Sequence, residues 1–217
     1  MPLAVCSDLS PADWIVASDI PWPRLVTIGP SGFAAYARVR FIPDPIREDQ
    51  RESEADLDAS PDEVDQWRSM LGLLAASTAD PDNCYFGLWD GWGFPEPARR
   101  WPTFGVPRGA RLPARSYFLF HGSLSEAEIW GGGAPADAGI WGPPEFSRGG
   151  APAFVWPSDH TWCIAADIDP HWAGIGASVP LIERLIDDPR LDAVEADPAD
   201  KQPTYVSCVA RRPAGRG

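Results

Sequence analysis

Apolar and polar residues follow one another along the chain in patterns that predict its strands. From Tyr36 to Ile42 the two kinds of residue alternate, which indicates a strand with one buried face. The segment 116–121 is apolar through its middle, and such a run is typical of a strand inside a sheet. Further strands are predicted at 83–89, 153–156, 161–168 and 204–209.

Two helices are predicted from apolar stripes that follow a helix-start signal. Ser60 and Glu63 form a capping box around Pro61, so we expect a helix over 61–77. A second helix is predicted over 178–186, with a proline in its first turn and aliphatic residues on one face. The apolar stripe of the first helix consists of Val64, Trp67, Met70, Leu71 and Leu74.

The order of these elements predicts a single α+β domain over residues 1–217. We expect a mostly antiparallel sheet, two main helices and long loops, because the chain holds 20 Gly and 25 Pro residues. The expected loops are a mobile acidic loop at 43–59 and an Arg- and Pro-rich loop at 95–115, and we expect a frayed tail at 210–217. The chain has no internal repeat and no linker that divides it.

Charge narrows the classes of partner. The chain has 217 residues and a net charge of −13, and residues 43–66 hold ten acids against two bases. A protein this acidic is a poor candidate for non-specific binding to nucleic acid or to an anionic membrane, because both need clustered cations. The five arginines of 95–115 are interpreted as partners for the protein's own acids or for an acidic partner. No apolar run has the length of about 18 residues that a membrane span requires.

The cysteines and the N-terminal sequence favour the cytoplasm. The four cysteines lie far apart and form no C-x-x-C pair, so we expect buried, reduced thiols rather than disulfides or a zinc site. The first residues lack the basic and apolar regions of a secretory signal. We expect no metal and no cofactor. The four thiols are those of Cys6, Cys84, Cys163 and Cys208.

The strongest candidate for chemistry is a cluster of Asp167, Asp169 and His171. If the strand over 161–168 continues through Pro170, all three side chains point to one face. Two carboxylates and an imidazole there would act as acid and base, or bind a ligand or a metal ion. The alternative is a solvated turn at Asp169, because aspartate before proline favours turns.

Tryptophan supplies the second set of candidates. The chain has 11 Trp residues, and several lie at the edges of expected loops. Exposed rings beside acids are a common way to hold flat ligands or a protein partner. The alternative is that the rings pin the loops onto the core. The candidate binding residues are Trp89, Asp90, Trp92, His160 and Trp172.

Two further comparisons with sequence motifs give little support for a phosphate-binding loop or for nucleophilic catalysis. Gly174 and Gly176 are expected in a turn between a strand and a helix, where phosphate loops occur, but no Gly-Lys-Ser/Thr follows them and Val179 replaces the glycine of the dinucleotide fingerprint. The chain also lacks a Gly-x-Ser-x-Gly elbow, a His-Glu-x-x-His helix motif and a Ser-x-x-Lys motif. Nucleophilic catalysis therefore has little support.

Four segments carry a resemblance to other proteins: CYFGLWDGWG (84–93), SYFLFHG (116–122), PAFVWPSDHTWCIAADIDPHWAGIGAS (152–178) and LIERLIDDP (181–189). They resemble a set of uncharacterised proteins of high-GC actinobacteria over most of the chain. That resemblance implies no activity, so no catalytic residue transfers. The strand, turn and LI-x-x-LI helix followed by Asp-Pro are also similar to immunity proteins of bacterial toxin systems, which implies a binding protein.

Three functions follow as hypotheses. The first is a non-enzymatic, immunity-like binding protein whose acidic surface engages a basic protein, such as a toxin domain that binds nucleic acid. The second is an enzyme that processes a small molecule or carbohydrate with Asp167, Asp169 and His171 in a Trp-lined cleft. A binding module for a small ligand, without chemistry, is a third.

Overall fold

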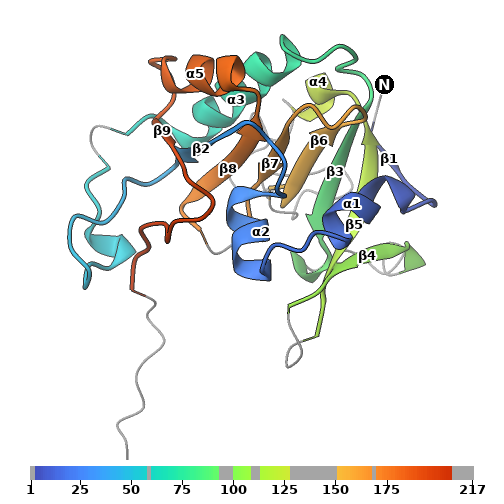
Figure 1. Cartoon of the computed structure of the whole chain (residues 1–217), viewed down its shortest axis with the longest axis horizontal. Helices are drawn as coiled ribbons and strands as arrows, with labels where there is room; N and C mark the ends of the chain where they lie inside the picture. The colour runs from blue at the N-terminus through green and yellow to red at the C-terminus, as the bar shows by residue number, and fades with distance from the viewer. Residues whose placement is uncertain are drawn as a thin grey trace, which may run out of the picture.

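The protein forms one nine-stranded antiparallel sheet in the computed structural model, which describes residues 3–57, 60–92, 100–108, 113–127, 151–167 and 170–206. The strand order is β1-β5-β3-β6-β7-β8-β2-β9, and β4 also pairs with β5 (Figure 1). This arrangement confirms the α+β class. The strands are β1 (Ala4–Val5), β2 (Ala35–Arg40), β3 (Cys84–Trp89), β4 (Thr103–Val106), β5 (Arg115–Gly122), β6 (Phe154–Pro157), β7 (Cys163–Ala165), β8 (Trp172–Ala177) and β9 (Ala193–Glu195).

Helices cover both faces of the sheet (Figure 1). One face packs against α3 (Glu63–Ala75), α4 (Leu124–Ala127) and α5 (Val179–Ile186). The other packs against α1 (Asp13–Val16) and α2 (Trp22–Ile28), two short helices that the sequence analysis did not predict. Three short 3₁₀ turns complete the described elements, at Ser10–Ala12, Glu52–Glu54 and Asp90–Trp92.

The two helical layers explain why the strands are buried on both faces. In β5, Phe118 and Phe120 belong to the core under α3, and Tyr117 and Leu119 belong to the core under α1 and α2. The expectation of a single buried face for β2 is wrong, because its four central residues are all buried. Alternation in that strand separates arginines from small apolar residues, and both kinds lie under a helical layer.

Helix α3 confirms the predicted stripe but starts later than expected. Asp62, not Ser60, caps it: the Asp62 carboxylate accepts hydrogen bonds from the backbone N–H of Val64 at 2.9 Å and of Asp65 at 3.3 Å. Val64 is only half-buried. The buried apolar residues of the helix are Trp67, Met70, Leu71 and Leu74.

The expected turn at Gly174 and Gly176 is wrong, because both residues lie inside β8, which is buried along its whole length. A Cβ at Gly174 would lie 2.3 Å from the carbonyl oxygen of Thr27, and one at Gly176 would lie 2.3 Å from the ring of Phe33. Glycine is therefore needed for close packing of α2 and the following loop against the strand.

The last strand also differs from the prediction. Residues 204–206 form no strand, and 207–209 lie outside the described residues. The final described strand is instead β9, which pairs with β2 at the edge of the sheet. The strand predicted over 161–168 is shorter than expected, since β7 ends at Ala165.

Candidate functional site

Charged residues collect at one end of the sheet. The antiparallel register brings the ends of β2, β3 and β7 together with the starts of β5, β8 and β9, because Arg40 pairs with Trp172, Trp89 with Tyr117, and Ala165 with Gly174. Two clusters of charged and aromatic side chains form there. We name them after their central residues, Arg115 and Asp44.

The Arg115 cluster is built around a buried ion pair. Arg115 Nη1 donates a hydrogen bond to Asp167 Oδ2 at 2.5 Å, and the two side chains are 9% and 1% exposed. The guanidinium of Arg115 also lies 4.9 Å from the ring centre of Trp89 and 5.2 Å from that of Trp22. Two sequence candidates, Trp89 and Asp167, therefore lie against the same guanidinium.

Arg108 and Tyr117 complete the Arg115 cluster. Arg108 follows β4, on the hairpin that joins this strand to β5. Its guanidinium lies 4.5 Å from the ring centre of Trp22. Burial raises the pKa of Tyr117 well above its ordinary value, and the negative charge of Asp167 raises it further. Tyr117 therefore stays a neutral phenol throughout the physiological pH range.

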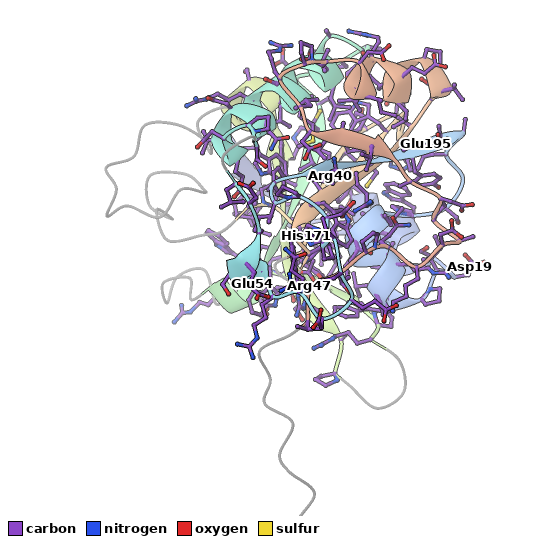
Figure 2. All side chains as sticks on the ribbon, turned by 90° about the vertical axis from the view of Figure 1, so that its left-hand side faces the viewer. Asp19, Arg40, Arg47, Glu54, His171 and Glu195 are labelled. Carbon is purple, nitrogen blue, oxygen red and sulfur yellow. The ribbon has the colours of Figure 1, made fainter. Side chains whose placement is uncertain are left out.

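The Asp44 cluster joins β2, β8 and β9 through a network of ion pairs and hydrogen bonds. Asp44 accepts hydrogen bonds from Arg38 Nη1 and Nη2 at 2.8 and 2.9 Å and from Arg40 at 3.2 Å. The Nε2 atom of His171 lies 3.2 Å from the same carboxylate, and Arg40 also bonds Asp192 at 2.5 Å. Arg38 and His171 are both buried. Figure 2 shows Arg40 and His171 close together in this region.

The pKa of Asp44 reports how strongly this cluster favours the ionised carboxylate. Burial alone would raise that pKa, but the hydrogen bonds from His171, Arg38 and Arg40 and the charge of Arg38 lower it far below its ordinary value. Asp44 is therefore a carboxylate at neutral pH and a weak proton acceptor, as an ion-pair partner should be.

Trp172 is buried, and the expectation of an exposed ring is wrong for this residue. It is the first residue of β8, its ring packs 4.9 Å from the guanidinium of Arg38, and its Nε1 donates to the carbonyl oxygen of Thr27 in α2 at 2.9 Å. The ring of His171, by contrast, lies edge-on to Tyr205 at 4.8 Å. The structure thus gives Asp167 and His171 different partners, Arg115 and Asp44, and Asp169 lies outside the described residues.

The other candidates are spread over both ends of the sheet. Asp90 is exposed in the 3₁₀ turn that follows β3, and nothing is described of the Trp92 side chain. His160 lies in the turn between β6 and β7, at the end opposite Trp89, where it stacks on Trp14 with ring centres 4.4 Å apart. The predicted binding set therefore does not gather in one cleft.

A groove that the sequence analysis missed lies beside the Asp44 cluster. It has a volume of about 610 Å³ and runs between residues 45–48 and residues 201–206. Ile46 is 89% exposed at one wall and Val206 is 41% exposed at the other. Tyr205 holds the second wall in place, since its hydroxyl donates to the carbonyl oxygen of Pro43.

The acidic segment that carries the first wall is folded on itself. Buried Gln50 accepts a hydrogen bond from the Ile46 N–H at 2.8 Å and donates to the Glu54 carbonyl at 3.2 Å. The Val206 N–H donates to the Gln50 carbonyl at 3.0 Å, which joins the two walls. Mobility of this segment stays a prediction, but its backbone has defined partners.

Comparisons with known proteins give no match, so any assignment of function rests on the geometry described above. No family model, no curated protein and no solved structure matches the chain. Within the described part of the chain, no group of three or more His, Cys, Asp or Glu side chains is arranged to hold a metal ion. None of the helices there is long and apolar enough to cross a membrane.

Proposed function

We propose that the protein is a non-enzymatic binding protein that engages a basic protein partner through its acidic surface. The observation that carries this proposal is the distribution of charge. Four arginines are buried or half-buried in the two clusters: Arg38, Arg40, Arg108 and Arg115. Among the described residues, twenty exposed acidic side chains therefore outnumber eight exposed arginine and lysine side chains. The surface is therefore strongly acidic.

Such a surface acts mainly on the rate of encounter. A long-range negative field accelerates association with a cationic protein and repels acidic ones, whereas buried contacts determine how long the complex lasts. A toxin domain that binds nucleic acid is a partner of this chemistry, and the proposal is thus of an immunity-like protein acting in the cytoplasm. The free, buried thiols of Cys84 and Cys163 are typical of a reducing compartment.

The state of the candidate catalytic residues also favours binding over catalysis. Asp167 is almost fully buried in its pair with Arg115, and His171 is buried against Asp44. A general acid or base must reach the proton that it transfers, and these side chains already hold partners inside the protein. We infer a structural role for both.

The test is capture of a partner from the native host, followed by reconstitution with the purified partner on a biosensor. We expect a basic protein whose association rate falls about tenfold or more between roughly 20 and 150 mM salt, with much less change in dissociation. Neutralising Glu48, Asp49, Glu52 and Glu54 together should slow association. Recovery of no basic protein, with turnover of a small molecule that Asp167→Asn abolishes, would favour the enzyme instead.

A further inference from the structure

The groove between residues 45–48 and 201–206 exposes apolar surface on an acidic part of the molecule. Ile46 has the largest exposed fraction of the described large apolar side chains, and Val206 faces the same groove. Pro45, Pro203 and Tyr205 supply the rest of its apolar lining. A volume of about 610 Å³ falls in the range of roughly 300–1,000 Å³ that is typical of sites that hold a small ligand or a few side chains.

Charge around the groove is negative in spite of two bases in its walls. Arg47 is neutralised locally, because its guanidinium bonds Asp49 at 3.1 Å and Glu54 at 2.9 Å. Figure 2 shows Arg47 and Glu54 next to each other on this side of the molecule. Glu48 lines the groove opposite Lys201, and both side chains are exposed.

The second wall lies within this negative field. Burial raises the pKa of the Tyr205 phenol, and the charges of Asp44 and Glu52 raise it further. A cationic side chain that enters the groove would therefore lie near the acids of the first wall. An apolar side chain next to it in the same ligand would cover Ile46 and Val206. A polar rim around an apolar centre is typical of protein interfaces, and in this groove the polar rim is mainly acidic.

We infer that this groove is the docking site for a short segment of the basic partner, in which an aliphatic side chain is flanked by arginine or lysine. The inference rests on the proposed function and names the part of the acidic surface that gives specificity. The aliphatic side chain covers Ile46 and Val206, and the flanking cations pair with Glu48 and Glu52. Charge complementarity selects the occupant, since an acidic or neutral segment would gain only the apolar contact.

The probe is a labelled peptide with leucines between arginines, GRLRLRG, measured by fluorescence anisotropy at about 50 mM salt. We expect Ile46→Ser with Val206→Ser to weaken its binding about tenfold, because both side chains are exposed and their loss leaves the core intact. Glu48→Gln with Glu52→Gln should weaken binding at least threefold and reduce its dependence on salt.

A matched control separates the groove from the general charge of the protein. Asp19→Asn with Glu195→Gln also removes two negative charges, but from exposed positions that Figure 2 shows away from Arg47 and Glu54. This variant should bind the peptide within twofold of the wild type. The peptide GRSRSRG, which keeps the charges and loses the leucines, should bind the wild type about tenfold more weakly.

Three results with the peptides would overturn the inference, and a fourth, with a captured partner, would do so as well. The first is equal weakening by the Glu48/Glu52 variant and by its control. The second is equal binding of the leucine and serine peptides. The third is tighter binding of the peptide when Arg211, Arg212 and Arg216 are replaced by glutamine, since the occupant would then be this chain's own basic tail. A captured partner that binds the Ile46→Ser/Val206→Ser variant as tightly as wild type refutes the groove alone, whereas absence of a basic partner refutes the proposed function.

Discussion

At the scale of single residues, the buried and half-buried arginines of this acidic protein form ion pairs that stabilise one end of its sheet. Arg38 and Arg40 share Asp44, and Arg115 pairs with Asp167. Breaking a buried pair leaves one charge without its partner, which typically costs about 3–5 kcal/mol. The two clusters therefore stabilise the end of the sheet where β2, β3 and β7 end and β5, β8 and β9 begin.

The Asp44 cluster predicts a loss of stability in acid. The pKa of Asp44 in the folded protein lies far below the value of about 4 in an unfolded chain. Its stabilising effect is therefore complete above about pH 5 and is lost as the pH falls through 4 toward the lowered pKa. We expect urea unfolding to show a smaller difference between pH 7 and pH 3 for Asp44→Asn than for wild type. Glu48→Gln, at an exposed position, should keep the wild-type difference; equal differences in all three proteins would contradict the prediction.

The thiols give a second prediction at this scale. Burial raises the pKa of Cys6 to about 11 and that of Cys84 to about 12, and it also raises the pKa of Cys163. Little thiolate exists at pH 8, so these groups should react slowly with a disulfide reagent. In a Cys208→Ser variant, we expect fewer than one fast thiol in the native protein and three after unfolding. Mass spectrometry that finds fast labelling at Cys84 or Cys163 would count against this burial.

At the scale of elements, close packing of α2 against β8 determines how helices cover the face of the sheet that lies under α1 and α2. Apolar periodicity predicted α3 because a stripe at helical spacing follows a helix-start signal within one segment, although the cap is Asp62 and not the predicted Ser60. It did not predict β8, because two glycines in six residues resemble a turn when the helix and loop that they accommodate lie far away in the sequence. The requirement for glycine comes from a long-range neighbour, and single-sequence patterns do not contain it.

This contact predicts opposite effects for two glycine replacements. Gly174→Ala places a methyl group 2.3 Å from the Thr27 carbonyl oxygen and 2.5 Å from Ile28 Cα, so the backbone of α2 must move. We expect a loss of about 2 kcal/mol or more in urea unfolding, in the range of overpacked cores. Gly72→Ala in α3 meets no described atom within 4 Å and should stabilise the protein by about 0.5–1 kcal/mol. Equal effects of the two changes would refute this account of β8.

The stripe of α3 supports a further prediction. Leu71 is 4% exposed in the core between α3 and the sheet, so Leu71→Ala should cost about 2–5 kcal/mol. Val64 lies on the same helix but is only half-buried, and Val64→Ala should cost clearly less. Thermal or urea unfolding measures both. A loss below about 0.5 kcal/mol for Leu71→Ala would mean that this face of the helix contributes no core.

At the scale of the whole molecule, the site depends on contacts between distant segments. The placement of Trp89 and Asp167 at one end of the sheet followed from the positions of two strand ends. Their shared partner Arg115 did not, since its loop gave no sign of where it would pack. The bonds of Asp44 to His171 and of Arg40 to Asp192 join residues 127 and 152 positions apart. Local periodicity specifies the elements but not which of them become neighbours.

The net charge predicts how salt affects the protein as a whole. A charge of −13 repels itself in the folded state, and raising NaCl from about 0.01 M to about 1 M shortens the Debye length from roughly 30 Å to 3 Å. We expect the midpoint of thermal unfolding to rise, because the buried pairs are screened less than the surface. The rise should be smaller after neutralisation of Glu48, Asp49, Glu52 and Glu54. A midpoint that falls with salt would show that surface attraction outweighs repulsion.

The position of β2 has a consequence for synthesis of the chain. This strand lies between β8 and β9, so both of its partners are made long after it. At roughly 5–20 residues per second, β2 is synthesised about 7–26 seconds before the first of these partners begins to be made. An unpaired strand in a nascent chain is a place where aggregation begins, and charged side chains discourage it. We therefore expect Arg38 and Arg40 to lower the tendency of the unpaired strand to pair with another copy of itself, before they bond Asp44 in the folded protein.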